Sequence, residues 1–594
     1  MNHKNNILYM FIILFILPLK LLVAESLFLI GNGNMLVGIN PEGNISFVNW
    51  QGIGGSNQMG SRNSSEGQSI KEKLLLEPTA FFLKTQDAIY SLTDNTTSEI
   101  KGEYINPEIP LIKLEGTKVG GNIEWEEEVF VHPYRDVIFI HFAIKEDFQP
   151  YSIDQLISYQ NISPSPPPIP ESPFLKPIEN IRNDFCSFWD ITHHALVHFR
   201  PYALGRGDIQ RFEQLKDTLA INPKFWRKFE EGAYIGVSSL NPIEGSAILD
   251  YPPSNIILSE IVTRTFPQEP YIFGDTCSTL ILKPIHNAES QQGITIFYAF
   301  AKNYSELEEL VDWITTQNYE KVKEELINYW QTRWDETNGN IKEDFAHNWL
   351  LLSLSSDPST GAILPNLKEA NCNNKLSLKD SFILVQDMNE MNMLDLSKKL
   401  IFFWNNVGKQ RKQLAKLTFP LQLYPDGISA TPDYWADISQ TTFFISMIYV
   451  QSNFLSFAEK KEFLNEVWDV LAWSIDNLCI WKVPGELIPA PSYESVLNRD
   501  IQSASLVIRT LIGVQSGIQL AKMIYKSVPE LWDERNREIQ TWIRLAILNK
   551  TALEIFPDDD FNYWKKFFPD NNPIWQLPVK YNGNIILLKD IAKH

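Results

Sequence analysis

The chain is poor in cysteine, in positive charge and in long apolar segments. Its 594 residues include four cysteines, Cys186, Cys277, Cys372 and Cys479, whose wide spacing excludes a cysteine-based metal cluster. At most two disulfides are possible, and the sequence does not define their pairing. Lysine and arginine number 52 against 72 acidic residues, which leaves a net charge of −20. This balance argues against nucleic acid as a partner, because a phosphate backbone attracts basic surfaces. Nothing in the sequence indicates a metal or a cofactor.

Apolar residues form one long run, at the N-terminus. Lys4 precedes an apolar segment from Ile7 to Leu17, and the stretch ends on Leu22-Val23-Ala24. This pattern is typical of a signal peptide over residues 1–24 and predicts a secreted or periplasmic protein. An uncleaved N-terminal anchor is the alternative, since apolar residues continue past Lys20. No other stretch approaches the roughly 20 apolar residues of a membrane span, so we expect no membrane contact beyond the signal.

Short alternating runs fill the region after the signal. With 44% hydrophobic and 21% charged residues the composition is that of a globular protein, and the length predicts at least two domains. Over residues 25–302, runs such as Val137–Phe142 and Gly293–Tyr298 are separated by Gly, Asn, Asp and Pro. This pattern predicts a large antiparallel β-sandwich. The prolines of residues 163–177 exclude a strand or helix there and indicate an extended loop.

Three histidines lie together in the segment HHALVH. If this segment is a strand, His194 and His198 share one face and His193 points to the other. No cysteine or carboxylate completes a metal-ligand set around them. We therefore expect these side chains to pack against the sheet or to form hydrogen bonds rather than to hold a metal.

The apolar period changes from two to 3.6 near residue 303. One stripe runs from Leu307 to Ile314 and a second from Val322 to Trp334, which predicts a helical linker over residues 303–340. Paired amphipathic segments then predict a helical domain over residues 341–594. They lie near 343–356, 379–393, 394–409, 441–456, 458–477, 502–526 and 531–548. The alternating inner and outer helices of an (α/α)6 toroid have this pattern, as do other helical arrays.

Residues 351–380 lead from an apolar helix, through a turn and a polar loop, to Lys379-Asp380 at the start of the next helix. This order resembles the first barrel segment of glucoamylase-type glycoside hydrolases, family 15. The opening Ile30-Gly31-Asn32-Gly33 is similar to the N-terminal β-sandwich of bacterial glucoamylases, and Trp330 with Trp334 matches the end of their helical linker. The resemblance covers residues 27–521. It implies a multidomain α+β protein: an antiparallel supersandwich, a helical linker and an (α/α)6-toroid-like catalytic-type domain.

The resemblance also implies sugar-binding residues. In the family an Arg-Asp pair binds hydroxyls of the terminal sugar, so Lys379 and Asp380 are expected to bind substrate. Lys379 keeps the charge of the family's arginine without its planar, bidentate fork. The alternative for Asp380 is a plain helix N-terminal charge. Further expected substrate contacts are Asp433, Trp435 and Asp437 in the loop 424–440 and Tyr493 in the loop 482–500.

Catalysis would require two carboxyl groups that flank the glycosidic bond. An ungapped comparison places Leu497 on the family's general acid, whereas a shift of three residues places Glu494 there, so Glu494 is the candidate acid. No segment matches the family's base loop. Six further helices with their connections would need about 100 residues, and 96 residues follow Asn498. The resemblance is therefore to a divergent member that is shortened at the C-terminus.

Three functional hypotheses follow. The first is an exported, inverting glucoamylase-like hydrolase of α-glucosidic bonds in oligosaccharides or polysaccharides. The second is a catalytically degenerate, carbohydrate-binding relative of the same fold, because the family's acid and base motifs are not preserved. The third is a structural or envelope-associated protein with neither property. The sequence leaves open whether the chain is an enzyme, which linkage it prefers and whether it forms oligomers.

Overall fold

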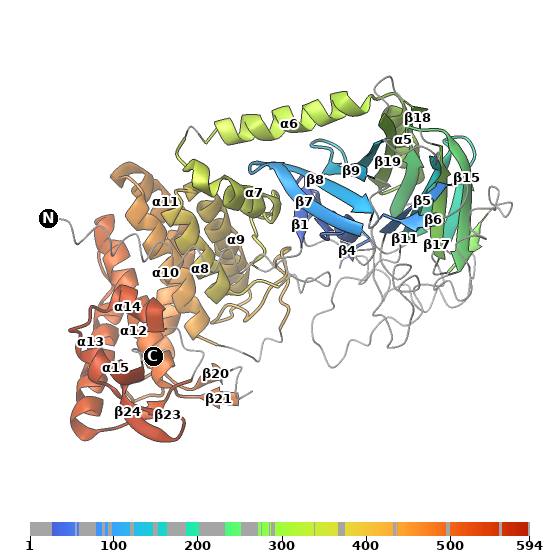
Figure 1. Cartoon of the computed structure of the whole chain (residues 1–594). Coiled ribbons are helices and arrows are strands. Elements are labelled where there is room, and N and C mark those ends of the chain that lie inside the picture. Colours follow the sequence, from blue (N-terminus) through green and yellow to red (C-terminus); the bar gives the residue numbers. More distant parts are fainter. Residues whose placement is uncertain are drawn as a thin grey trace. The chain divides into compact units, whose positions relative to one another are not determined.

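The computed structural model contains two compact units (Figure 1). The first, called the sheet unit, extends to Pro358, and the second, called the helical unit, comprises Ser359–Pro365 and Lys375–His594. The residues that the structure describes are 27–53, 56–58, 79–85, 89–92, 98–118, 124–145, 153–162, 186–200, 232–250, 271–274, 276–283, 285–286, 291–337, 339–365, 375–431, 435, 437–494, 499–556 and 561–591. The expected signal peptide, the proline-rich segment and Asp433 lie outside them. The domain boundaries expected at 302 and 340 stay predictions.

Within the described ranges, the sheet unit has three sheets whose neighbouring strands are antiparallel. A ten-stranded sheet has the order β16-β12-β13-β14-β19-β10-β9-β8-β7, with β18 also paired to β19. A five-stranded sheet has the order β15-β17-β11-β5-β6, and a four-stranded sheet has the order β1-β2-β3-β4. The strands are β1 Phe28–Gly31, β2 Met35–Ile39, β3 Ile45–Trp50, β4 Ser56–Asn57, β5 Thr79–Thr85, β6 Ile89–Ser91, β7 Ser98–Asn106, β8 Ile109–Lys118, β9 Glu124–Val131, β10 Val137–Lys145, β11 Ile153–Asn161, β12 Cys186–Asp190, β13 Ala195–Arg200, β14 Ala233–Ser239, β15 Ile243–Asp250, β16 Ile272–Phe273, β17 Thr276–Leu282, β18 Ile285–His286 and β19 Gln291–Ala301.

Alternation along these strands places one face of each sheet in a shared apolar core. In β10, Ile138, Ile140 and Phe142 are fully buried, and the Phe142 ring centroid lies 4.9 Å from that of Phe81 in β5. Buried side chains from all three sheets belong to this one core. Period-two burial is what two facing sheets require, so the predicted antiparallel sandwich is confirmed.

A polar group lies inside this core. The Arg200 Nε donates to the Ile162 carbonyl at 2.8 Å, and its Nη1 donates to the Cys186 carbonyl at 3.0 Å. The two ring nitrogens of His198 lie 2.9 Å from the hydroxyls of Ser187 and Ser278. These partners offset a burial that would otherwise be costly. Burial also holds the pKa of His198 well below its ordinary value, so the ring is neutral.

The three clustered histidines do not share a strand. His193 and His194 lie in the turn between β12 and β13, and only His198 lies within β13. The expectation that His194 and His198 share one strand face is therefore wrong, because the strand begins one residue after His194. The His193 Nδ1 lies 2.6 Å from the carboxylate of Asp190. His193 and His198 thus form hydrogen bonds, which is the role expected for them.

Cysteine contributes no disulfide among the described residues. Cys186, Cys277 and Cys479 are buried, and Cys372 lies outside the described ranges. Burial raises the pKa of the Cys186 thiol to about 11 and that of Cys479 to about 12. Both thiols are therefore protonated and unreactive at neutral pH.

Among its described residues the sheet unit also has the α-helices α5 (Tyr304–Thr315), α6 (Tyr319–Asp335) and α7 (Ala346–Leu354), with a 3-10 turn at Glu343–Phe345. The side chains of Asn303 and Asn318 cap the first two by accepting from backbone N–H groups of the first turn. The Trp330 and Trp334 rings both contact Trp349 of α7, with centroids 6.0 Å and 5.3 Å from it. The tryptophan pair singled out in the sequence thus packs α6 against α7.

In the helical unit, helices alternate between inner and outer positions. The bounds are α8 Leu378–Glu390, α9 Leu394–Gln413, α10 Ser439–Phe454, α11 Phe457–Ile480, α12 Ala504–Met523, α13 Glu530–Asn549, α14 Phe561–Phe567 and α15 Leu588–Ile591. The inner helix α10 packs between α8 and α12, while α9, α11 and α13 pack behind them. Short strands lie between these helices along the chain, namely β20 Ser492–Glu494, β21 Arg499–Ile501, β22 Leu553–Glu554, β23 Pro578–Tyr581 and β24 Asn584–Leu587.

Hairpins of one inner and one outer helix are the repeating element of an (α/α) toroid. Each amphipathic segment expected from the sequence corresponds to a helix, from α7 to α13. Among the described helices, α12 is long and apolar enough to cross a membrane, but 83% of its most apolar window is buried inside the structure. A helix that is buried to this extent lies in the core of its unit. The predicted fold class, antiparallel sheets followed by a toroid-like helical domain, is confirmed.

Gly116 of β8 offers a test of the sandwich packing. It is paired with Trp125 of β9, whose buried indole lies over the glycine, and a Cβ at position 116 would overlap that ring. We expect Gly116→Ala to lower the unfolding free energy of the sheet unit by about 1–3 kcal/mol, the cost of overpacking a core. Calorimetric unfolding measures this loss. Thr117→Ala, at the half-buried neighbouring position, is the control, and an equal loss in both variants would contradict the packing argument.

Candidate functional site

Three segments of the helical unit come together where α8, α10 and α12 begin. Leu376, just before α8, exchanges two backbone hydrogen bonds with Leu423, at 2.7 Å and 2.9 Å. The hydroxyl of Ser492 accepts from the backbone N–H of Ile438 at 2.9 Å, which ties the loop before α12 to the start of α10. These contacts join segments 375–380, 423–440 and 482–503, here named the loop cluster.

Two of the expected substrate-binding aromatics stack inside the loop cluster. The rings of Trp435 and Tyr493 have centroids 5.4 Å apart and planes within 5° of parallel. Tyr493 is buried in β20, which pairs with β21, and Trp435 is half-buried. The two residues come from different loops, so their stacking shows that the loops expected to hold the site do meet.

Asp437 is a buried carboxylate of the loop cluster. Its Oδ1 accepts from the backbone N–H of Ser439 at 2.9 Å and from the Ser492 hydroxyl at 3.2 Å. Its Oδ2 accepts from the Ser439 hydroxyl at 2.7 Å and from the Gln440 amide at 3.0 Å. A carboxylate offers about four acceptor positions, so this one is filled by protein donors. Asp437 therefore fixes the start of α10 to the loop before α12.

Arg509 of α12 extends this network, and sequence inspection missed it. Its Nη1 donates to the Ser439 hydroxyl at 3.2 Å, and its guanidinium carbon lies 5.4 Å from the Phe443 ring centroid. The residue sits within an apolar helical pattern, where a basic side chain needs a polar partner. That isolated charge in a buried helix is the signal that could have identified it.

Lys379 and Asp380 occupy the first turn of α8, as expected. Ser377 is the N-cap: its hydroxyl accepts from the Asp380 backbone N–H at 3.1 Å and donates to the Asp380 carboxylate at 2.6 Å. This reciprocal cap stabilises the helix start, and the acidic charge is favourable there. The Asp380 side chain is exposed, so capping leaves it accessible to a ligand. Sugar binding by the pair stays a prediction.

The structure describes the remaining expected residues only in part. Glu494 is the last residue of β20, opposite Arg499, and its side chain lies outside the described part. Leu497, the position that the ungapped comparison assigns to the acid, is also outside it, as is Asp433. The role of Glu494 as general acid stays a prediction.

A second carboxylate of α8 was not expected. Burial, followed by the nearby charge of Glu390, raises the pKa of Asp387 to about 6, while Lys566 of α14 acts in the opposite direction. A carboxyl that titrates close to neutral pH is suited to proton donation. Asp387 lies about 10 Å along the helix axis from Asp380, however, on the basis of the helical rise. Asp387 shares its stripe of α8 with Asp380, Ile383 and Glu390, which are exposed or half-buried, so helical periodicity gave no signal for it.

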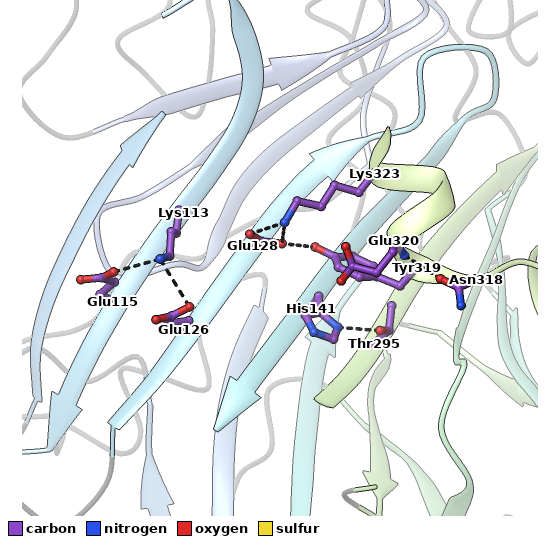
Figure 2. Close-up of polar contacts among 10 residues, drawn as sticks. All are labelled: Lys113, Glu115, Glu126, Glu128, His141, Thr295, Asn318, Tyr319, Glu320 and Lys323. Atoms are coloured by element: carbon purple, nitrogen blue, oxygen red, sulfur yellow. Dashed lines mark hydrogen bonds and ion pairs between the residues drawn. The ribbon is translucent and has the colours of Figure 1, made fainter. Parts of the chain in front are cut away.

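A polar cluster also lies on the outer face of the ten-stranded sheet, beside α6 (Figure 2). The Lys323 Nζ lies 2.6 Å from both carboxylate oxygens of Glu128, and the Tyr319 hydroxyl donates to the same carboxylate at 2.5 Å. The His141 ring stacks on Tyr319 with centroids 4.0 Å apart, and its Nδ1 lies 2.7 Å from the Thr295 hydroxyl. The cluster therefore anchors the start of α6 to the sheet.

The titration of this cluster follows from its burial. Burial lowers the pKa of His141 to about 4, with Glu128 raising and Lys323 lowering it further. Burial and the Glu128 charge raise the pKa of the Tyr319 hydroxyl well above its ordinary value. Both groups are thus neutral at physiological pH. The arrangement is that of a structural anchor.

Comparisons with known proteins identify the architecture. A bacterial glucoamylase solved in complex with acarbose is 12% identical, with a TM-score of 0.61, and the match covers 88% of this chain and 67% of that chain. The chain has the fold of that glucoamylase. The resemblance inferred from the sequence is confirmed at the level of fold. At this identity the similarity shows the fold alone.

Other solved structures match less well. A putative kojibiose phosphorylase from the human microbiome is 9% identical, with a TM-score of 0.46 and coverage of 88% of this chain and 68% of the other. A family GH92 α-mannosidase from Bacteroides thetaiotaomicron, in complex with mannoimidazole, is 9% identical, with a TM-score of 0.30 and coverage of 83% and 58%. No family model matches the chain, and no curated protein matches it by sequence.

The raised pKa of Asp387 predicts that the helical unit loses stability as pH rises. Its folded-state pKa of about 6 exceeds the ordinary 3.8, so the folded state binds more protons between these values and stability falls across that window. Asp387→Asn should remove this fall, on the order of 2–3 kcal/mol. Thermal unfolding between about pH 4 and about pH 7 measures it.

The control for this measurement is Asp395→Asn. Asp395 lies in α9 of the same unit and its side chain is 94% exposed, so its replacement should leave the pH dependence unchanged. Two outcomes would contradict the raised pKa of Asp387. One is a wild-type helical unit that gains stability from about pH 4 to about pH 6, and the other is an Asp387→Asn variant whose stability changes with pH as the wild type's does.

His141 predicts the opposite dependence in the sheet unit. Its folded-state pKa of about 4 lies below the ordinary 6.5, so the unfolded state binds more protons between these values and stability is lost as pH falls through the window. His141→Gln should reduce that loss by on the order of 2 kcal/mol. Unfolding at about pH 4.5 and about pH 7.5 tests it. The exposed His194, replaced by Asn, is the control, and equal acid sensitivity of all three proteins would contradict the prediction.

Proposed function

We propose that this chain is a carbohydrate-active protein whose loop cluster binds gluco-oligosaccharides or polysaccharides with α-glucosidic bonds. Two findings support the proposal. The fold is that of a glucoamylase whose structure holds acarbose, and the loop cluster holds stacked aromatic rings next to hydroxyl and amide side chains. The chain's acidic character suits a neutral ligand.

The Trp435–Tyr493 stack is the observation that carries the proposal. Flat aromatic rings supply the apolar surface against which the C–H face of a pyranose packs, and the adjacent polar groups orient the hydroxyls. Within the cluster the stack adjoins Ser492, which bonds to Asp437 and Ile438, so the aromatic wall is held by hydrogen bonds. Lys379 and Asp380, in the same cluster, are the proposed partners of the terminal sugar's hydroxyls.

Hydrolysis is the second candidate function. The glucoamylase fold favours an inverting mechanism on α-glucosidic bonds, with Glu494 of β20 as the proposed general acid. Such a mechanism also needs a base with an open acceptor position for the attacking water. Asp437 does not offer one, because its four positions are filled. Sugar binding needs no such base, so a degenerate, binding-only relative is the alternative to an enzyme.

We also propose that the protein is exported to the periplasm or beyond the cell. The N-terminal pattern of a basic residue, an apolar run and a small closing residue supports this proposal.

Binding should depend on the aromatic stack. Trp435→Ala is expected to weaken the affinity for maltooligosaccharides roughly tenfold, because a stacked ring contributes about 0.5–1.5 kcal/mol beyond its buried area. Isothermal titration calorimetry on the purified chain measures the change, and Trp435→Phe, which keeps a ring, is the matched control. Affinity that is equal in the wild type and both variants would place the binding site elsewhere.

The same sugars distinguish the two candidate functions. Glucose release by the wild type that is lost in Glu494→Gln, with binding retained, would establish a hydrolase whose acid is Glu494. Turnover that survives Glu494→Gln would remove that residue from the mechanism. Binding without glucose release by the wild type would establish a relative that kept its sugar site and lost catalysis. No binding at all would leave a structural role.

A further inference from the structure

A polar pocket lies within the sheet unit. It has a volume of about 450 Å³ and is lined by the turn between β1 and β2, the turn between β9 and β10 and the first turns of α5. Pockets of this size hold small-molecule ligands. The pocket shares no residue with the loop cluster.

Hydrogen bonds hold the pocket wall in place. The Asp136 Oδ2 accepts from the Asn34 amide at 2.5 Å and from the Trp50 indole N–H at 2.8 Å. The Asn32 amide donates to the carbonyls of His132 and Arg135, at 3.1 Å and 3.0 Å. Both turns are thereby tied to each other and to a buried tryptophan of β3. A pre-formed wall reduces the ordering cost of binding.

The lining offers acceptors and donors side by side. Glu306 and Glu309 of α5 supply carboxylate oxygens, and the lining also includes Arg135, whose guanidinium lies 4.1 Å from the centroid of the Trp313 ring. A carboxylate accepts hydrogen bonds and a guanidinium donates them, so together they can bind neighbouring polar groups of one ligand. A ligand with adjacent hydroxyls, each of which both donates and accepts, matches this lining.

An aromatic ring completes the pocket. Tyr134 lines it and is 69% exposed, although it is a large side chain. Its ring is positioned by edge contacts with Tyr329 and His132, at centroid distances of 5.1 Å and 6.0 Å. An exposed, positioned ring beside convergent polar groups supplies the apolar surface that the C–H face of a pyranose requires.

We infer that this pocket is a second carbohydrate site, which binds one pyranose unit of a neutral gluco-oligosaccharide between Tyr134 and the carboxylates of α5. The choice of a glucan rests on the proposed function, and the pocket itself is independent of the loop cluster.

Calorimetric titration of the full chain with maltoheptaose tests this inference. The wild type should show two binding events, and Tyr134→Ala should remove or weaken one of them at least tenfold, whereas Tyr134→Phe should keep both. Glu309→Gln should weaken the same event. Tyr525→Ala, at a tyrosine of the helical unit that is 85% exposed, is the control for loss of a surface ring. Unchanged stoichiometry and affinities in Tyr134→Ala and Glu309→Gln would overturn the second site.

The variants separate this inference from the proposed function. If Trp435→Ala abolishes all binding and the pocket variants bind as the wild type does, the second site is wrong and the loop cluster stands. If the pocket variants abolish all binding and Trp435→Ala has no effect, the second site stands and the loop cluster is wrong. Binding of glucosamine oligosaccharides, lost in Glu309→Gln, without any binding of maltoheptaose would overturn the assignment of a neutral sugar.

Discussion

The four hydrogen bonds that Asp437 accepts are the contact on which the loop cluster depends. They join the loop before α10 to the loop before α12 through Ser492, and Arg509 reaches the same network through Ser439. Asp437 is buried, so removal of its carboxylate would leave several donors without partners, each at a cost of about 1–3 kcal/mol. The Trp435–Tyr493 stack exists because these loops are held together: each ring comes from one of them.

Much of the fold could be predicted from the sequence, because burial on one face leaves a periodic signal. The segments expected at 394–409 and 531–548 correspond to α9 (Leu394–Gln413) and α13 (Glu530–Asn549). Both are outer helices with one buried face, which is where a 3.6-residue period is strongest. The turn that holds His193 and His194 was misjudged because two strands and their tight connection fall within one short segment. Period alone does not locate a turn without Gly or Pro.

The candidate site could be predicted only in part, because its contacts join distant residues. Aromatic residues in polar loops identified Trp435 and Tyr493, but their parallel stack depends on the packing of α10 against α12. The Glu128–Lys323 pair joins residues 195 apart, and no local pattern encodes such a contact. The raised pKa of Asp387 likewise arises from burial beside α14, which helical periodicity along α8 does not report. Residue type and spacing in the sequence thus indicate which side chains could take part in binding or catalysis, and only the fold shows which of them lie in contact.

Catalysis and binding make different demands on the same carboxylates. An inverting hydrolase needs one carboxyl that gives a proton and one that accepts a proton, with an open position on each. Neither Asp387 nor Asp437 meets these requirements: Asp387 has the raised pKa of an acid but lies on α8 away from the loop cluster, and Asp437 lies in the loop cluster with its acceptor positions filled. Sugar binding needs only an oriented aromatic surface and accessible polar groups, which the stack and the exposed Asp380 provide. A test of turnover at Glu494 is therefore separate from a test of sugar binding at the stack.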